Sequence, residues 1–540
     1  MKTRNTDRAS SLKKSKFRAS CVALGIGFIY WMNIAEAQVV HKNGLRVPCT
    51  NGESASYKCS GLDLLSVLTP EELGASMSCR GGNKRCRVND MWGWYDEQAD
   101  REYAIIGRED GTAFVDVTNP THPVYLGNLP PSAGLPQFWR DIKVYNDHAF
   151  IVADRQPGSG MQVFDLRQLR SVGASPVEFQ SSAVYHGFSH AHNIAINEES
   201  GYAYVVGYSI TAQSAECGKG LHIVDISNML SPTYAGCFRY YGSSIKEADG
   251  YTHDAQCVTY HGPDQDYLNR EICVGFNEKS ITFVDVTDKS APTEIAKATY
   301  AGVQYVHQGW LTDDHRYVFQ NDELDEYYGS VERTRTLVWD VIDLDDPVLL
   351  TEYEGEQSAD HNLYINGNLM YQSNYKDGLR IVDISDPAVP REIAYFDTHE
   401  DDPADTYPFS GAWSNYPYFR SGAIGITSRD EGFFMVMPTF STPTAREQTE
   451  VPENIVFIDA FPNPFSNRFS ISFELKVTQE IEISVFDVLG RLVKNVYTGV
   501  VNAGRGHVID VLLEKQSPGS YFYRVQGKDF SVTKPVTLIY

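Results

Sequence analysis

Four of the 14 histidines occupy the same position in a recurring pattern of the chain, and each is followed by a polar residue. The aligned pairs are Arg140-Asp141, His192-Asn193, His253-Asp254, His307-Gln308, His361-Asn362 and, in the last unit, Trp413-Ser414. Imidazole is a common ligand of Zn, Mn, Fe, Cu and Ni, and three or four imidazoles suffice for a site with room for water or substrate. We therefore predict that His192, His253, His307 and His361 hold a divalent transition metal, with Zn or Mn as the candidates.

The residues beside these histidines have a second predicted role as ligand-binding groups. Those groups are Arg140, Asp141, Asn193, Asp254, Gln308, Asn362 and Trp413. Arg140 would supply a fixed positive charge for an anionic ligand, and Trp413, with Trp92 or Trp94, an aromatic surface for a sugar ring. His190, two residues before His192, would share its face of the strand.

A structural interpretation of the same pairs stays open. Repeated polar residues at the start of strands can brace neighbouring strands through hydrogen bonds. Adjacent strand residues point to opposite faces, so either the histidines or the Asn, Asp and Gln residues after them face the channel directly.

The element that must position these residues is a short strand that ends in Asp. It recurs as GTAFVDVTNP, GMQVFDLRQL, GLHIVDISNM, SITFVDVTDK, RTLVWDVIDL and GLRIVDISDP, whose aspartates Asp116, Asp165, Asp225, Asp285, Asp340 and Asp383 lie 49, 60, 60, 55 and 43 residues apart. This period is too long for a helical solenoid and close to that of a propeller blade. With EGFFMVMPT at 431–439 as another unit, we predict an all-β fold, a β-propeller with seven blades as the preferred count.

A propeller would also explain how distant histidines could meet. The first strand of every blade lines the central channel, so one residue type at one position of that strand forms a ring around the axis. The four imidazoles would then converge from consecutive blades.

The N-terminal residues predict export. Residues 1–37 contain seven Lys or Arg, the apolar run CVALGIGFIYWMNI and then Ala35-Glu36-Ala37, which is the layout of a secretory signal peptide. An uncleaved membrane anchor is the weaker alternative, because the apolar run is shorter than a spanning helix requires. We expect no transmembrane segment in the mature chain.

Cysteine content agrees with an oxidising compartment. Eight cysteines remain after residue 37, which favours disulfides over zinc. Cys217 with Cys237, and Cys257 with Cys273, are predicted hairpin disulfides. The pairing of Cys49, Cys59, Cys79 and Cys86 stays open.

Net charge excludes one class of partner. The chain beyond residue 37 contains 39 basic and 68 acidic residues, which gives a net charge of −29. Such a surface repels phosphate backbones, so we predict no nucleic-acid partner.

Composition divides the rest of the chain. Residues 38–87 are predicted to be a cysteine-containing cap with one short helix at 68–77, residues 88–440 the propeller, and 441–453 a linker. Alternating segments in 454–540 predict a small β-sandwich.

Two resemblances follow from quoted segments. The last part of the chain resembles the type A C-terminal sorting domain of the type IX secretion system. The matching segments are FPNPF, FSISFEL, IEISVFDVLGRLV, GHVIDV, SPGSYFYRVQ and KPVTLIY. This resemblance implies the type IX machinery as a partner, and location outside a two-membrane bacterium, secreted or on the cell surface. The chain also resembles choice-of-anchor B proteins, whose repeats are similar to the LVIVD type. The matching segments are CSGLDLLS, NDMWGWYD, REYAIIG, WRDIKVYNDHAFIV, AHNIAIN, YTHDAQCV, HQGWLTDDHRYVFQNDELDE, DHNLYING and GAWSNYPYF. That family implies architecture and location but no reaction.

One acidic loop is a lesser candidate. NDELDE at 321–326 could bind calcium, but it lacks the spaced ligands of a helix-loop-helix site, and a solvated acidic loop is the favoured interpretation.

Two functions are the main candidates, and a purely structural surface-layer component that binds no ligand is a third. The first is a secreted or surface-displayed binding module for an extracellular glycan or protein, with a histidine-lined metal or ligand site. The alternative is a metal-dependent lyase or hydrolase acting on an extracellular polymer, by analogy with propeller lyases. No sequence motif assigns catalytic residues.

Overall fold

The computed structural model describes residues 44–538 with gaps. Residues 80–83, 137, 156, 210–216, 240–250, 400–406, 441–454, 462–466, 488–490, 505, 514–515, 517–518 and 529 lie outside the description, as do 1–43 and 539–540. The predicted signal peptide and linker therefore fall outside the described residues. Within those residues, no helix has the length and apolar character needed to cross a membrane.

Residues 44–440 form seven sheets in their described part, each with at least four strands; their named strands pair antiparallel except for the parallel pair β7 and β11. In spatial order the first three sheets are β4 (Val88–Asp96), β5 (Arg101–Arg108), β6 (Gly111–Asp116), β7 (Val124–Leu129) and β11 (Val177–Glu178); β8 (Arg140–Tyr145), β9 (His148–Ala153), β10 (Met161–Asp165) and β12 (Ala183–Tyr185); and β13 (Asn193–Asn197), β14 (Tyr202–Val206), β15 (Leu221–Asp225) and β16 (Thr233–Phe238). The next two are β17 (Asp254–Thr259), β18 (Glu271–Phe276), β19 (Ile281–Asp285) and β20 (Thr293–Ala298); and β21 (Val306–Leu311), β22 (Tyr317–Asp322), β23 (Arg335–Asp340) and β24 (Val348–Glu354). The last two are β25 (Leu363–Asn366), β26 (Leu369–Ser373), β27 (Leu379–Asp383), β28 (Arg391–Phe396), β2 (Tyr57–Ser60) and β1 (Glu53–Ser54); and β29 (Ala412–Tyr416), β30 (Ile424–Ser428), β31 (Gly432–Pro438) and β3 (Leu62–Leu68).

The first strands of these sheets contact one another in a closed cycle. The order of contact is β4, β8, β13, β17, β21, β25, β29 and back to β4. Such a cycle is the inner wall of a propeller, and it places residues at the start of each first strand on a common rim. The prediction of an all-β propeller is confirmed.

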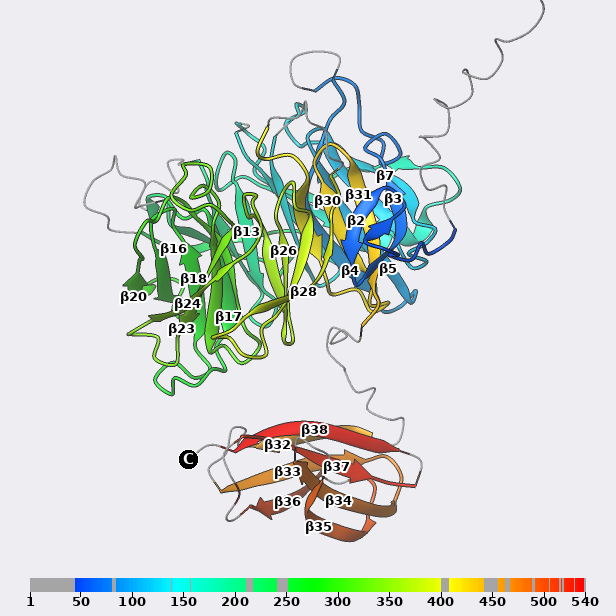
Figure 1. Ribbon diagram of the computed structural model, residues 1–540, viewed down its shortest axis with the longest axis vertical. Coiled ribbons are helices and arrows are strands. Elements are labelled where there is room, and N and C mark those ends of the chain that lie inside the picture. Colours follow the sequence, from blue (N-terminus) through cyan, green and yellow to red (C-terminus); the bar gives the residue numbers. More distant parts are fainter. Residues whose placement is uncertain are drawn as a thin grey trace, which may run out of the picture. The chain divides into compact units, whose positions relative to one another are not determined.

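The last sheet is completed by the beginning of the chain. β3 pairs antiparallel with β31, and Figure 1 shows the blue strand β3 beside the yellow strands β30 and β31. All seven residues of β3 are buried. β2 likewise pairs with β28. Residues that the sequence assigned to a cap thus belong to propeller sheets, because their alternating apolar side chains complete two blade cores.

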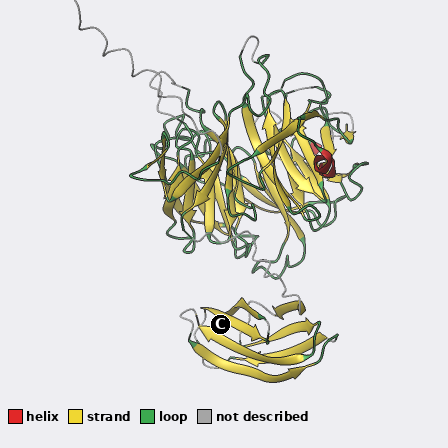
Figure 2. Ribbon diagram, turned by 90° about the vertical axis from the view of Figure 1, so that its right-hand side faces the viewer, coloured by secondary structure: helices red, strands yellow, loops and turns green. Residues whose placement is uncertain are grey.

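The predicted helix at 68–77 is only one turn long. Thr69 Oγ1 accepts a hydrogen bond from Glu72 N, and Leu73 N donates to Thr69 O, as at the start of a helix. Gly74 then adopts a φ of 77°, which ends the turn. The described residues contain a single 3-10 helix, η1 (Leu166–Ser171), drawn in red in Figure 2.

The repeated aspartates terminate the third strand of six blades in the same way. In each case the side-chain Oδ1 accepts a hydrogen bond from the backbone N–H two residues further on; the pairs are Asp116–Thr118, Asp165–Arg167, Asp225–Ser227, Asp285–Thr287, Asp340–Ile342 and Asp383–Ser385, at 2.9–3.0 Å. This Asx turn reverses the chain toward the fourth strand. The repeat spacing of the aspartates in the sequence therefore reflects one such turn in each of these six blades.

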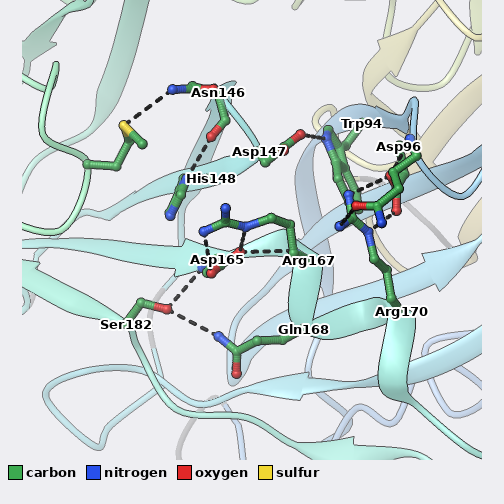
Figure 3. A network of polar contacts seen from close by, with 12 residues as sticks. Trp94, Asp96, Asn146, Asp147, His148, Asp165, Arg167, Gln168, Arg170 and Ser182 are labelled. Atoms are coloured by element: carbon green, nitrogen blue, oxygen red, sulfur yellow. Dashed lines mark hydrogen bonds and ion pairs between the residues drawn. The ribbon is translucent and has the colours of Figure 1, made fainter.

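Blades are also joined at their loops. In Figure 3, Arg170 of η1 reaches Asp96 at the end of β4 with two hydrogen bonds of 2.6 and 2.7 Å, and Trp94 Nε1 donates to Asp147 Oδ1 at 3.2 Å. Asp96 is fully buried, so this contact couples the first and second blades.

Four disulfides are present. Cys217–Cys237 and Cys257–Cys273 confirm the predicted hairpin pairs. Cys257 and Cys273 are direct cross-strand partners on β17 and β18. The remaining pairs are Cys49–Cys59 and Cys79–Cys86.

The C-terminal region forms two sheets that share a core. One contains β32 (Ile455–Phe461), β33 (Arg468–Leu475) and β36 (Gly506–Leu512); the other contains β35 (Leu492–Val501), β34 (Gln479–Asp487), β37 (Gly519–Gln526) and β38 (Ser531–Leu538). Buried side chains of both sheets, among them Phe473 and Tyr523, make one cluster. This is the predicted small sandwich.

Candidate metal centre

The four predicted imidazoles meet at the inner rim of the propeller. His192 and His253 immediately precede β13 and β17, His307 is the second residue of β21, and His361 lies two residues before β25. Their ring centroids are separated by 4.5, 4.3 and 4.4 Å in chain order, and Trp413 continues the arc 4.4 Å from His361. We call His192, His253, His307 and His361 the imidazole cluster. Histidines 54 to 61 positions apart in the chain thus touch, because consecutive blades place them on one rim.

Hydrogen bonds fix the tautomer of three of these histidines. Nδ1 of His253 lies 2.9 Å from the carbonyl O of His307, and Nδ1 of His361 lies 2.6 Å from the carbonyl O of Trp413. A carbonyl oxygen only accepts, so both Nδ1 atoms carry the proton and both Nε2 atoms keep a lone pair. Nδ1 of His192 lies 3.2 Å from Asp154 Oδ2, which has the same consequence.

Burial keeps His253, His307 and His361 neutral. His253, His307 and His361 are 3–4% exposed. Burial, followed by the repulsion of neighbouring imidazoles, holds the pKa of His253 and His307 well below its usual value, and burial lowers the pKa of His361 to about 3. Neutral imidazole is the form that binds metal.

His307 has a nitrogen without a partner in the protein. Its Nδ1 is buried and makes no hydrogen bond. Burying such an atom costs free energy unless a ligand or water satisfies it. The cluster is therefore not a fully satisfied structural network.

A carboxylate completes the cluster. Glu323, just after β22, places Oε2 3.9 Å from Nε2 of His307 and Oε1 4.0 Å from Nε2 of His361. Two ligands at about 2.1 Å from one ion lie at most about 4.2 Å apart, so both separations suit a shared metal. Ligand atoms of the three residues all lie within 4.8 Å of one another.

Further polar groups surround Glu323. Burial raises its pKa to about 7, and the hydroxyl of Tyr375 donates a hydrogen bond to Oε1. Arg429 packs over the ring of Trp413, 5.3 Å from its centroid, and its charge acts on both Glu323 and His361. The centre thus combines imidazoles, a protonatable carboxyl group and a guanidinium.

A second carboxylate supports the other end of the arc. Asp154, just after β9, lies 3.1 Å from Nδ1 of His190 and accepts from Nδ1 of His192 at 3.2 Å. Burial raises its pKa, but these hydrogen bonds outweigh burial and hold the pKa well below its usual value. His190 therefore shares a partner with His192, as the sequence predicted for its face.

Arg140 occupies the equivalent position in the second blade, but its side chain bonds to the backbone of Arg108 and not to the imidazole cluster. Its Nε donates to the carbonyl O of Arg108 at 2.8 Å, and burial lowers its pKa to about 10. The positive charge expected from Arg140 is instead provided by Arg429.

The tryptophans divide between three environments. Trp413 is 8% exposed and contacts the imidazole cluster, whereas Trp94 is buried against Tyr103. Trp92 lines a separate cavity of about 110 Å³ with Lys143 and Trp310, further along the inner strands. Trp413 is thus the member of this group that adjoins the cluster.

The polar residues after Arg140 and after the histidines brace the inner strands. Asp141 Oδ2 accepts from Ile194 N at 2.8 Å, and Asn193 Nδ2 donates to His253 O at 3.0 Å. Gln308 exchanges two hydrogen bonds with the backbone of Leu363.

The equivalent polar residues of two further blades also form hydrogen bonds. Asn362 Nδ2 donates to Asp90 Oδ2 at 3.0 Å, and Asp254 Oδ1 accepts from Ala255 N at 2.7 Å. The histidines thus converge at the rim, and Asp141, Asn193, Gln308 and Asn362 bond to other blades, whereas Asp254 bonds within its own strand. The metal-binding and ligand-binding roles of these residues stay predictions.

Sequence reasoning missed Glu323, Tyr375, Arg429 and Asp154. Only Glu323 stood in a segment that drew attention, as part of NDELDE. The other three lie in loops after second strands, where no repeated residue type marks them.

Comparison with protein families supports this architecture. Residues 101–129, 189–239, 272–299 and 360–398 match the LVIVD repeat. Residues 459–538 match the secretion system C-terminal sorting domain. This is a secreted or cell-surface protein. The sorting domain implies handling by the type IX secretion machinery, as predicted.

Comparisons with whole proteins add little. No curated protein matches the sequence. Among similar solved structures are a protein from Lactobacillus plantarum (12% identity, TM-score 0.41, covering 79% of this chain and 99% of that one) and the computationally designed Ika8 protein (11%, 0.39, 73% and 97%). A functionally unknown protein from Desulfotomaculum acetoxidans is also similar (10%, 0.38, 58% and 86%). These low scores carry no argument about function.

Proposed function

We propose that this exported propeller is a binding module whose imidazole cluster holds one divalent transition metal, Zn or Mn. His307, His361 and Glu323 are the proposed ligands, and His253 and His192 offer further Nε2 lone pairs. The single observation that supports the proposal most is the convergence of His307 and His361 on Glu323, whose carboxylate oxygens lie 3.9 and 4.0 Å from the two Nε2 atoms. An extracellular glycan or protein would bind at the rim beside Trp413 and Arg429.

The donor set agrees with this choice of metal. Two imidazoles and a carboxylate are a common protein set for zinc, and they leave positions open for a ligand. The neighbouring carbonyls of His307 and Trp413 and the carboxylate of Asp154 orient three rings, which is the usual supporting arrangement around a metal site.

Metal analysis tests the proposal directly. We expect the purified mature protein to contain about one equivalent of Zn or Mn, or to bind it in calorimetric titration. The double variant His253→Ala plus His307→Ala should lose the metal, and Glu323→Gln should weaken affinity at least about tenfold.

A matched control separates ligation from burial. His222 is also a fully buried histidine, but it lies in the core of the third blade beside Tyr185. His222→Gln should retain the metal. Metal-free wild-type protein that also fails to bind added Zn or Mn would refute the proposal.

A second candidate is a metal-dependent lyase or hydrolase acting on an extracellular polymer. The contact between Tyr375 and Glu323 beside the imidazoles favours it, because both side chains can exchange protons with a bound substrate. Arg429 could pair with a carboxylate of an acidic polysaccharide.

Turnover distinguishes the two functions. An enzyme should cleave at least one polymer in a panel of polyuronates and neutral glycans, and Tyr375→Phe should slow cleavage while leaving metal content unchanged. Binding without cleavage would favour the module.

A further inference from the structure

The inner strands hold a second set of equivalent residues, and these surround a cavity away from the imidazole cluster. Counting three residues on from Arg140, from each histidine of the cluster and from Trp413 gives Lys143, Ala195, Gln256, Trp310, Tyr364 and Tyr416. The first four of these residues line a cavity of about 110 Å³, together with Trp92 of the first blade. Five of the seven inner strands thus supply its walls, which places the cavity on the central channel of the propeller.

Ala195 leaves the space that the cavity occupies. The other blades carry long or aromatic side chains at the equivalent position, whereas Ala195 has only a methyl group. The lining includes the half-buried Trp92 and Trp310 and the exposed Glu198, so the cavity is accessible from solvent. An enclosed cavity of about 150 Å³ holds one benzene ring. This smaller but open cavity can therefore accept one six-membered ring and no more.

One side of the cavity is aromatic and rigid. The Trp92 ring packs edge to face against Tyr416 and Tyr364, with centroids 5.2 and 5.6 Å apart. Trp310 makes the same kind of contact with Tyr364 at 5.1 Å. These contacts hold both indoles in place. Fixed aromatic rings are suited to pack against the C–H groups of a sugar ring.

The walls also carry N–H groups that have no partner in the described part of the chain. Nε1 of Trp92, Nε1 of Trp310 and Nε2 of Gln256 make no hydrogen bond there. Gln256 is nevertheless held in place, because its Oε1 accepts from Leu311 N at 2.7 Å. Trp94 differs from the two cavity tryptophans, since its Nε1 donates to Asp147. The cavity therefore combines apolar faces with donors for the oxygen atoms of a ligand.

The surroundings of Lys143 favour a neutral ligand. Its Nζ donates to Asp141 Oδ1 at 2.7 Å and lies 4.7 Å from the centroid of the Trp92 ring. Burial lowers its pKa, but the carboxylates of Asp141, Asp90 and Asp254 outweigh burial and raise it. The ammonium charge is thus already compensated, and an anionic ligand would meet these carboxylates as well.

We propose that this cavity binds one neutral sugar ring. The indoles of Trp92 and Trp310 would pack against the C–H groups of the ring. Gln256 Nε2 and Lys143 Nζ would donate hydrogen bonds to its hydroxyl oxygens. The site is separate from the imidazole cluster and needs no metal, so it does not rest on the proposed function.

Saturation-transfer NMR of the purified mature protein tests the proposal. The probes are the methyl glycosides of glucose, galactose and mannose, each in both anomers. At least one should bind with a Kd on the order of 1 mM, which suits a ligand of so few atoms. Its ring C–H protons should receive the strongest saturation, because they would lie against the indoles. Failure of every probe to bind would overturn the proposal.

Filling the cavity should block the probe. Ala195→Leu puts a larger side chain into the space and should abolish binding. Trp310→Ala removes one aromatic wall and should weaken binding about tenfold. Trp310 is only half-buried, so Trp310→Ala keeps the test decisive if Ala195→Leu fails to fold. Unchanged affinity in either folded variant would mean that the sugar binds elsewhere, and the proposal would fail.

A matched pair of substitutions separates the cavity from general packing. Trp310→Phe keeps an aromatic ring but loses an unpaired N–H group, so it should weaken binding less than Trp310→Ala does. Trp94→Phe removes an N–H group that is bonded within the protein and should leave the probe affinity unchanged. If Trp94→Phe weakens binding as much as Trp310→Phe, the cavity is not the site.

Chelation separates this site from the proposed metal centre. Chelator-treated wild type should bind the probe as tightly as untreated protein. A sugar that binds only before chelation would lie at the imidazole cluster, which overturns the separate site. A metal-free protein that binds the sugar would refute the proposed metal and still support this inference.

Two further probes test the class of ligand. Methyl glucuronide carries a carboxylate, and indole is aromatic without hydroxyl groups. The structure favours the neutral glycosides over both. Binding of methyl glucuronide or indole in the absence of any neutral glycoside binding would overturn the assignment to a neutral sugar.

Discussion

At the residue scale, burial decides what each histidine can do. His253, His307 and His361 are buried next to one another, and Nε2 of His307 and Nε2 of His361 both lie close to the carboxylate of Glu323. His222 is equally buried, but it sits among aromatic side chains, with Nε2 3.0 Å from the Tyr185 hydroxyl. The same residue type is therefore a candidate ligand at the rim and a core residue within a blade.

His222 should make the protein sensitive to acid. Burial lowers its pKa to about 4, below the value of about 6.5 in an unfolded chain. Above pH 6.5 the ring is neutral in both states. Between pH 6.5 and 4 the unfolded state binds a proton that the native state does not bind. The free energy of unfolding therefore falls by up to about 1.4 kcal/mol for each unit by which the pH is lowered.

The variant His222→Gln isolates this contribution. Urea unfolding measured from pH 7 to 4 should show a shallower loss of stability for His222→Gln than for wild type. The exposed His122→Gln is the control and should follow wild type. Equal slopes for His222→Gln and wild type would contradict the prediction.

At the element scale, the repeated Asp fixes where each third strand ends. Its carboxylate satisfies a backbone N–H of the turn, and the following strand returns antiparallel. A sequence period is visible because this turn needs an acceptor side chain at one position, whereas the apolar strand residues are interchangeable.

Removing one such turn should destabilise one blade modestly. Asp383→Ala deletes the 2.9 Å bond to Ser385 N and should lower the free energy of unfolding by about 1–2 kcal/mol. Asp383→Asn keeps an acceptor and should retain most of that stability. Chemical denaturation of the three proteins measures the difference; identical losses for Ala and Asn would show that charge, not the turn, matters.

At the scale of the whole molecule, the ring is closed by strands from opposite ends of the repeat region. β3 lies against β31, although more than 360 residues separate them along the chain. Closure removes the open sheet edge of the last blade and holds His361 and Trp413 in adjacent blades. The candidate centre depends on this closure.

Weakening the closing strand should therefore destabilise the entire propeller. Leu64 is 0% exposed and pairs with Val436, so Leu64→Ala should cost about 2–5 kcal/mol. Leu45→Ala, at an 81% exposed position, should change stability by less than about 0.5 kcal/mol.

Tryptophan fluorescence provides the measurement. All tryptophans beyond residue 37 lie between 92 and 413, so the signal reports the propeller and not the sorting domain. A fluorescence transition in Leu64→Ala that coincides with wild type would show that β3 is dispensable.

The sequence by itself determined the repeat, the all-β fold, the sorting domain, two disulfides and the position of the four histidines. These features are local or periodic, so the chain displays them directly. Tertiary structure alone brought Glu323, Tyr375, Arg429 and Asp154 to the rim and buried Asp325 of NDELDE. Those side chains come from loops of different blades, and their proximity is set by how the blades close around the axis, which no spacing along the chain encodes.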